Sequence, residues 1–175
     1  MKFPRFAYRS RQFWHALLKP EVHVPAEALH LYLSPAQLIL FRQLQPGEQT
    51  HAYRVFNQIK ASGNTNADLL AAALLHDIGK IHVPLSIFDR VVIVMGKHLF
   101  PKAARRWGEG SPRGWRRPFV VAEKHATWGA DLAEKAGVSD LTAELIRSHH
   151  EAGSLKPASA LERLLGELQT ADGGN

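Results

Sequence analysis

The stretch LLAAALL at residues 69–75 is the sequence feature that most constrains the fold of this chain. Seven consecutive apolar residues, rich in alanine and leucine, favour a helix that has to be buried. The stretch ends on His76 and Asp77, two side chains that cost free energy to bury without partners. A metal ion, a salt bridge or an ordinary helix C-terminus could each satisfy them, so the first question is what His76 and Asp77 contact.

The length and composition indicate a single globular domain around this helix. The chain has 175 residues, of which 45% are hydrophobic and 22% charged, as is ordinary for a globular protein with a sizeable core. It has no cysteine, so disulfides and thiol nucleophiles are excluded and any metal must be held by His, Asp or Glu. No stretch reaches the roughly 18 apolar residues of a membrane span. The basic N-terminus lacks the apolar core of a signal peptide, and we expect a cytoplasmic protein.

Capping residues and helix breakers predict an all-α fold, a compact irregular helical bundle. Ser34 is a good N-cap that precedes Pro35 at a first helical position. A Pro-Gly pair at 46–47 breaks this helix, and Asn66 caps a helix over 67–78 that a glycine ends. The segment 85–99 is rich in β-branched residues, and its context favours helix over strand. The expected helices are 35–44, 48–61, 67–78, 85–99, 118–136, 139–150 and 158–171.

We expect two parts in the chain, an N-terminal leader over 1–33 and a globular domain over 34–175. The leader mixes basic residues with aromatic residues and leucines, which is compatible with a short amphipathic helix. Such a helix could pack on the domain or on a membrane surface, and packing on the domain is favoured.

A basic insert at 97–117 stands apart from the rest of the domain. It holds seven Lys and Arg residues and one acid, Glu109, so it carries the whole net charge of +6. Its glycines and prolines predict an irregular loop over 101–118. The insert could be a solvated loop, or a surface for phosphates, nucleic acid or an anionic membrane with Trp107 and Trp115 available for stacking.

Histidines are numerous, ten in all, and half of them fall at predicted helix positions together with Asp77 and Asp172. Imidazole and carboxylate suit Fe, Mn, Zn or Ni, and phosphate chemistry often uses two such ions. Lys80 lies one turn beyond His76, where its ammonium could neutralise charge on a phosphoryl group. The histidines at helix positions are His51, His76, His125, His149 and His150.

With these residues the sequence resembles the HD-domain superfamily of metal-dependent phosphohydrolases. The pattern of that superfamily is a helical His, a His-Asp doublet and a terminal Asp, and AALLHDIGK at 72–80 is a specific match. The extra histidines and the HHE at 149–151 are similar to the HD-GYP cyclic-dinucleotide phosphodiesterases, and the late Ala-Asp pair at 171–172 to HD hydrolases of dinucleoside polyphosphates and nucleotides. The resemblance implies an all-α bundle of the HD-domain type.

The resemblance also implies a ligand set. It assigns one ion to His51, His76, Asp77 and Asp172, and a second to Asp77, His125, His149 and His150, with Asp77 bridging. The metals it implies are two divalent transition ions, Fe, Mn, Ni, Co or Zn. Asp77 and Lys80 would be the catalytic residues.

Two departures from the HD-GYP pattern limit what the resemblance implies. The GYP signature is missing after HHE, so cyclic-di-GMP is not assumed as the substrate. The carboxylate four residues before the first His, which supports a third ion in some members, is Gly47 here, and Glu48 is one position out of place.

The predicted function is hydrolysis of a phosphoester or phosphoanhydride in a small phosphorylated, nucleotide-like substrate by a metal-activated water. Arginines of the basic insert could grip a distal phosphate. The alternative is a non-catalytic HD module that binds a nucleotide or a protein partner for signalling, and a nucleic-acid surface on the insert and leader is a third possibility. The candidate phosphate ligands are Arg105, Arg106, Arg116 and Arg117.

Overall fold

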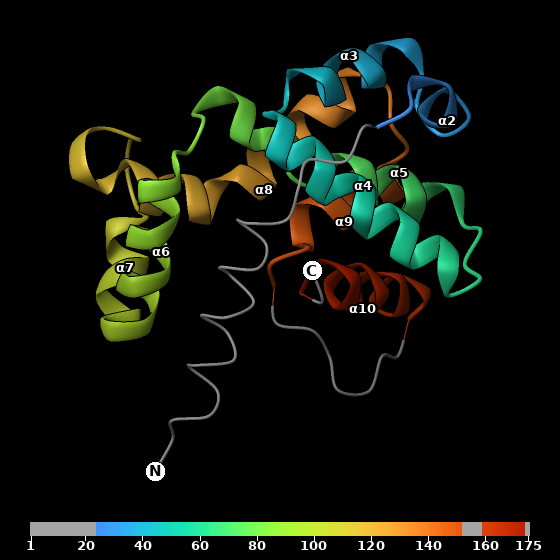
Figure 1. The fold of residues 1–175 in the computed structure, drawn as a ribbon. Helices are drawn as coiled ribbons and strands as arrows, with labels where there is room; N and C mark the ends of the chain where they lie inside the picture. The colour runs from blue at the N-terminus through green and yellow to red at the C-terminus, as the bar shows by residue number, and fades with distance from the viewer. Residues whose placement is uncertain (1–23, 152–158, 174–175) are drawn as a thin grey trace.

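The structure, a computed structural model, describes residues 24–151 and 159–173, and all regular elements in these two ranges are helical (Figure 1). This confirms the predicted all-α fold. Within the same ranges no helix is both long and apolar enough to cross a membrane. The elements are α2 (Ala26–His30), α3 (Pro35–Gln43), α4 (Pro46–Ala61), α5 (Ala67–Leu75), the 3-10 helix η1 (Ile78–His82), α6 (Ile87–Leu99), α7 (Pro101–Trp107), the 3-10 turn η2 (Gly114–Arg116), α8 (Arg117–Lys135), α9 (Asp140–Ser148) and α10 (Ala160–Gly173).

Helix α5 is the centre of the bundle, as its composition predicts. All seven residues from Leu69 to Leu75 are buried. The helix is capped by the Asn66 side chain, which accepts a hydrogen bond from the backbone N–H of Leu69 at 2.9 Å. It packs against α4 on one side and α9 on another, and α10 covers α4, α5 and α9. Three neighbouring helices therefore pack on α5.

Helix α8 crosses α9 and η1, and a pair of glycines lets the backbones meet at the second crossing. A Cβ added to Gly79 would lie 1.9 Å from the carbonyl oxygen of His125 and 2.7 Å from the amide nitrogen of Gly129. No side chain larger than hydrogen fits there without moving one backbone. This crossing places the η1 end of the His-Asp doublet directly against α8.

Three of the helix ends that differ from the prediction bear on the site. Helix α5 ends at Leu75, and the chain continues through a turn into η1, so the expected helix over 67–78 is three residues too long. Helix α4 begins at Pro46, which occupies the first helical position where proline is well tolerated. Helix α9 ends at Ser148, which leaves His149 and His150 just beyond the helix.

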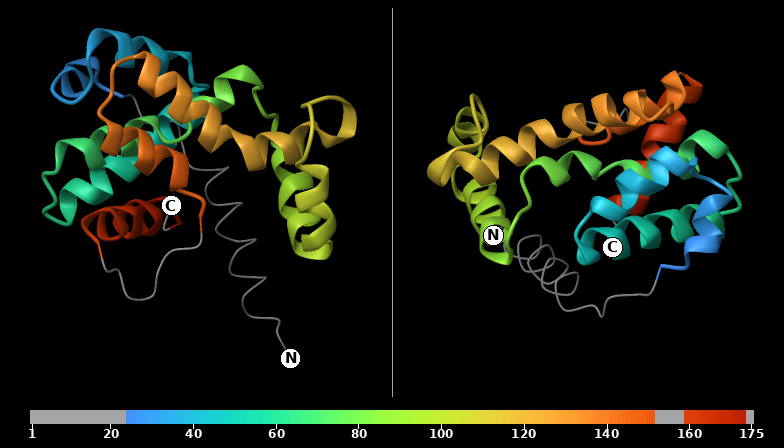
Figure 2. Two further views of the ribbon diagram at one scale, coloured as in Figure 1. Left: turned by 180° about the vertical axis from the view of Figure 1, so that it is seen from behind. Right: turned by 90° about the horizontal axis from the view of Figure 1, so that it is seen from above.

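The basic insert is more ordered than its composition predicts. Helix α6 confirms the helical interpretation of 85–99. The expected irregular loop over 101–118 contains α7 and η2 instead. Helix α7 forms because Pro101 starts it, Ala104 is buried against neighbours, and Gly108 ends it. Helices α6 and α7 make a hairpin at the N-terminal end of α8, away from α4 and α10 (Figures 1 and 2).

The segment before α3 contributes to the core. Val24, Leu29 and Leu33 are buried among the apolar residues of the bundle. The amphipathic helix predicted for the leader falls on residues 1–23, outside the described residues. The tract that follows HHE, at 152–158, is outside them as well.

Candidate metal centre

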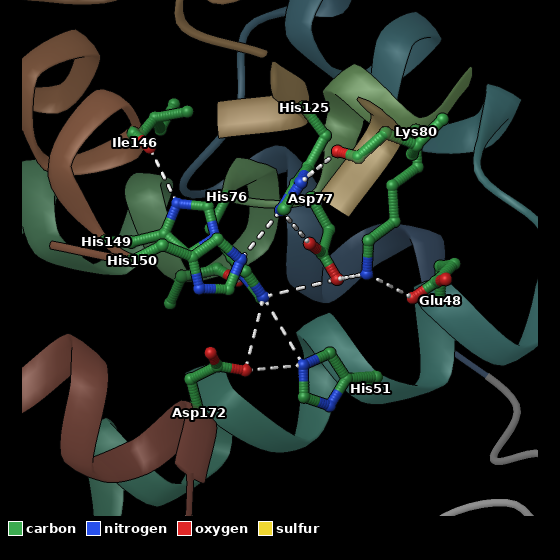
Figure 3. A network of polar contacts seen from close by, with 12 residues as sticks. Glu48, His51, His76, Asp77, Lys80, His125, Ile146, His149, His150 and Asp172 are labelled. Carbon is green, nitrogen blue, oxygen red and sulfur yellow. Dashed lines mark hydrogen bonds and ion pairs between the residues drawn. The ribbon is translucent and has the colours of Figure 1, made fainter. Parts of the chain in front are cut away.

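Seven side chains predicted as metal ligands converge at one place, although they come from five different parts of the chain (Figure 3). Helices α4, α8 and α10 each contribute one ligand, the turn after α5 contributes two, and the turn after α9 contributes two. Because α5 and α9 end just before the doublets, both doublets extend from the ends of buried helices into a shared polar space. The residues are His51, His76, Asp77, His125, His149, His150 and Asp172.

The ligand atoms form two groups of three. In each group the three candidate atoms lie within 4.8 Å of one another, close enough for a single ion. In the first group His51 Nε2 is 2.8 Å from Asp172 Oδ1 and 3.3 Å from His76 Nε2. The two groups are His51, His76 and Asp172, and His125, His149 and His150.

Asp77 lies between the two groups and points one oxygen at each. Its Oδ2 is 3.5 Å from His76 Nε2 in the first group. Its Oδ1 is 3.4 Å from His125 Nε2 in the second. A carboxylate in this position could contribute an oxygen to each group if two ions were bound, and two-ion sites are common in phosphate chemistry.

Backbone carbonyls orient three of the imidazoles. Nδ1 donates to the Ala73 carbonyl at 2.9 Å in His76, to the Val121 carbonyl at 2.8 Å in His125, and to the Ile146 carbonyl at 2.7 Å in His149. A proton on Nδ1 leaves Nε2 as the free lone pair of the neutral ring. The helices that end here therefore fix both the direction and the tautomer of these ligands.

The polar atoms of the centre fit a bound cation. His149 Nε2 is buried and has no hydrogen-bond partner among the described residues. His125 Nε2 and His150 Nε2 face each other at 2.8 Å, so they need a proton or a cation between them. Nitrogen and carboxylate ligands without thiolate suit divalent first-row metals.

Electrostatics in the first group favour positive charge. Burial opposes protonation of His76, but the charges of Asp77 and Asp172 outweigh it and raise the pKa of His76 to about 9. Burial likewise opposes ionisation of Asp77, yet the charge of Lys80 and then that of His76 hold the pKa of Asp77 well below its usual range. A proton and a metal ion therefore compete for His76.

In the second group, His149 and His150 are neutral imidazoles. Burial, followed by the charge of His76, lowers the pKa of His149 to about 2. Burial and the adjacent His125 lower the pKa of His150 to about 4. Both rings are therefore in the state that coordinates metal at neutral pH.

A family comparison adds to this geometry. The family model of the HD domain matches residues 49–172 of the sequence. The chain belongs to the HD-domain superfamily of metal-dependent phosphohydrolases. The match spans every candidate ligand, from His51 to Asp172. No curated protein and no solved structure matches the chain, so the likeness to the HD-GYP branch stays a prediction.

Next to the ligands, this HD domain holds Lys80 in an acidic environment. Its Nζ is 2.6 Å from Asp77 Oδ2 and 3.4 Å from Glu48 Oε2. Burial opposes the charge of Lys80, but these two carboxylates outweigh it and raise its pKa. The ammonium is therefore charged and fixed beside the proposed bridging carboxylate.

Glu48 belongs to the centre, although the sequence analysis noted it only as a carboxylate one position out of place. It is buried, and its second oxygen accepts a hydrogen bond from Arg90 of α6 at 2.6 Å. The signal was available, since Glu48 precedes His51 by three positions and so shares its face of α4. What the sequence could not show is that this face meets Lys80 and α6. Glu48 contacts Lys80 rather than the candidate ligands.

The four arginines proposed as phosphate ligands are not gathered at the centre. Arg105 and Arg106 are exposed on α7, which packs against α6 and α8. Arg116 is exposed at the start of α8, and Arg117 forms an ion pair with Asp89. The first turn of α8 is eight residues from His125, about 12 Å along the helix axis. Their role stays a prediction, and it requires a substrate that spans this distance.

Proposed function

We propose that this HD domain is a metal-dependent phosphohydrolase that cleaves a phosphoester or phosphoanhydride in a nucleotide-like substrate. The observation that carries the proposal is Asp77, whose two oxygens face two separate groups of metal-ligating side chains. A structural ion pair would not need a ligand group on each side. Membership of the HD-domain superfamily supports the same reaction class.

The donor set supports two divalent ions, with Fe, Mn, Ni, Co and Zn as candidates. His51, His76 and Asp172 would hold one ion, and His125, His149 and His150 the other, with Asp77 shared. When bound, such a pair supplies a nucleophilic water at neutral pH and polarises a phosphoryl oxygen.

The residues of the chain contribute position and charge to this reaction. Lys80 is fixed by Asp77 and Glu48, and its ammonium can stabilise negative charge on a phosphoryl oxygen next to the centre. Asp172 stays ionised because hydrogen bonds from His51 and His76 outweigh the effect of burial and lower its pKa. Burial of His125 and His149 excludes bulk water from one side of the centre.

Metal analysis combined with a substrate screen tests the proposal. We expect protein purified without chelator to carry a divalent transition metal by elemental analysis. After addition of Mn, Fe, Ni or Co it should hydrolyse at least one compound among bis(p-nitrophenyl) phosphate, mononucleotides, dinucleoside polyphosphates and cyclic dinucleotides. Asp77→Ala should lose both the metal and the activity.

Asp140→Asn is the matched control, since Asp140 is an exposed acid at the start of α9. It should keep metal and activity, and circular dichroism should show that both variants are folded. An active Asp77→Ala protein that holds no metal would refute the proposal. Bound metal without turnover of any phosphate compound would instead favour a non-catalytic HD module that binds a nucleotide or a protein.

A further inference from the structure

Helix α6 exposes an apolar face that no described residue covers. Phe88 is 75% exposed and Leu99 57% exposed. Phe88, Met95 and Leu99 are seven and four positions apart, a spacing that puts them on one face of a helix. The opposite face packs inward, because a Cβ on Gly96 would meet the ring of Phe119 at 2.4 Å. The exposed apolar residues of this face are Ile87, Phe88, Val94, Met95 and Leu99.

Cations and aromatic rings are also exposed on α7 and η2, the elements that follow α6 in the chain. Phe100 and Trp115 are also exposed large apolar residues. The segment 97–117 carries seven Lys and Arg residues against one acid. Apolar side chains flanked by basic ones are typical of helices that lie in the interface of an anionic membrane. The exposed cations of the hairpin are Lys97, Lys102, Arg105, Arg106, Arg113 and Arg116.

The charge excludes two other occupants of this face. A second copy of the chain would bring two strongly basic hairpins together, with repulsion between them. The leader is equally unsuited, since residues 1–23 hold five Lys and Arg residues and a single acid. A nucleic acid would match the charge, but it has no use for an aliphatic stripe of isoleucine, valine, methionine and leucine. An anionic bilayer matches both features.

We propose that the α6–α7 hairpin is a peripheral membrane-binding element that places the exposed face of α6 in the interface of an anionic bilayer. A 13-residue helix is about 20 Å long, so α6 would lie in the plane of the membrane. Ion pairs of Asp89 with Arg117 and of Arg90 with Glu48 fix α6 to the bundle. The HD domain would therefore be held at the surface in a defined orientation.

Vesicle co-sedimentation tests this proposal. The wild-type chain should bind vesicles of phosphatidylcholine and phosphatidylglycerol, and it should not bind vesicles of phosphatidylcholine alone. Phe88→Ser with Leu99→Ser should weaken binding at least about tenfold through lost apolar burial. Arg105→Gln with Arg106→Gln should weaken it about 25-fold, since each cation near an anionic surface contributes about a fivefold factor. Added salt should reverse binding.

The matched control is Leu31→Ser with Ile39→Ser, which removes two exposed apolar side chains elsewhere on the surface, 81% and 62% exposed. This variant should bind vesicles as the wild type does. Trp115 gives an independent readout, since its fluorescence should shift to the blue on anionic vesicles and the shift should be smaller in Trp115→Phe. Melting temperatures should show that all variants are folded.

Three results would overturn the proposal. The first is equal binding to neutral and anionic vesicles, or to neither. The second is a dimer in light scattering that Phe88→Ser with Leu99→Ser dissociates, without vesicle binding, which would assign the face to a second copy. The third is a salt-sensitive complex with polyuridine RNA that this apolar variant leaves unchanged, without vesicle binding, which would assign the surface to nucleic acid.

Discussion

Around α5, apolar side chains face inward and surround a group of candidate metal ligands, whereas on α6 several apolar side chains face outward and the hairpin carries exposed cations. Asp77 and His149 are almost completely buried. Arg105 and Arg106, in the hairpin, are exposed. Polar and charged side chains are therefore buried in one region and exposed in the other, and the same holds for apolar side chains.

The difference shows what each region can recognise. The buried imidazoles of His76, His125 and His149 are oriented by backbone carbonyls, so they could bind a small ion with defined geometry. Exposed cations on a hairpin interact through long-range charge, which is screened by salt and needs no fixed geometry. A small change in the centre should therefore have a large effect, and a larger change in the hairpin a small effect on chemistry.

The largest effect is expected at the glycine crossing. In Gly79→Ala the new Cβ would overlap the His125 carbonyl oxygen, so the η1 and α8 backbones must separate. We expect the free energy of unfolding to fall by about 3 kcal/mol, and the His-Asp doublet to move away from α8. Urea denaturation of the metal-free protein measures the change in the free energy of unfolding.

Gly166→Ala is the control for that substitution. Gly166 lies within α10, and nothing stands within 4 Å of an added Cβ. Because alanine favours helix more than glycine does, this variant should be more stable by roughly 0.5–1 kcal/mol. If Gly79→Ala were as stable as Gly166→Ala, the close crossing would not be a feature of the folded protein.

Lys80→Gln should separate catalysis from metal binding. The variant loses the charge and keeps a polar side chain that is one bond shorter, so the turnover number should fall about 100-fold. The metal content should stay unchanged, because Lys80 contacts carboxylates and is not a ligand. Lys135→Gln, an exposed lysine at the end of α8, should leave turnover as it is. Loss of metal together with turnover in Lys80→Gln would contradict this assignment.

Metal affinity should depend on pH through His76. Its folded pKa is about 9, so at neutral pH an entering ion has to displace a proton from this ring. The apparent association constant should therefore rise about tenfold per pH unit up to pH 9. Titration calorimetry with Mn at pH 6.5, 7.5 and 8.5, in two buffers of different ionisation enthalpy, measures both the slope and the released proton. An affinity that does not change with pH would show that His76 is already neutral.

The stability of the metal-free protein should decrease with rising pH, whereas the metal affinity should increase. A raised histidine pKa stabilises the fold fully below the unfolded value of 6.5, and this contribution is lost as the pH rises through about 9. The melting temperature of the metal-free protein should therefore decrease over this interval. His76→Gln, which cannot titrate, should show a smaller decrease.

The sequence was most informative where local patterns determine structure. The run from Leu69 to Leu75 predicted a buried helix, and the capping residue Asn66 predicted its start. The pattern of histidines and aspartates around this helix predicted a set of candidate ligands, and the fold brings these side chains together. The two predictions for α5 succeed because its capping and its apolar character depend on residues that are neighbours in the chain.

The sequence was least informative where a contact between segments that are distant in the chain determines the local structure. Helix α5 stops at Leu75 because the next residues turn into η1, which packs on α8. Helix α7 forms in a segment rich in glycine and proline because Ala104 and Trp107 pack on neighbours, Trp107 against Phe119. Glu48 meets Lys80 only once α4 and η1 are adjacent. None of these contacts leaves a signal at one position of the sequence.

The smallest effect on chemistry is expected in the hairpin. Arg105→Gln with Arg106→Gln should change kcat/KM for a short soluble phosphodiester less than about twofold. Both residues belong to α7, which lies at the end of α8 that is distant from α4 and α10 (Figure 2). The same variant should bind anionic vesicles about 25-fold more weakly. A tenfold loss of kcat/KM for a dinucleotide, with no loss for the short ester, would instead show that these arginines grip a distal phosphate. The hairpin would then belong to the substrate site. The hairpin and the buried centre would serve the same reaction, and they would differ only in their distance from the cleaved bond.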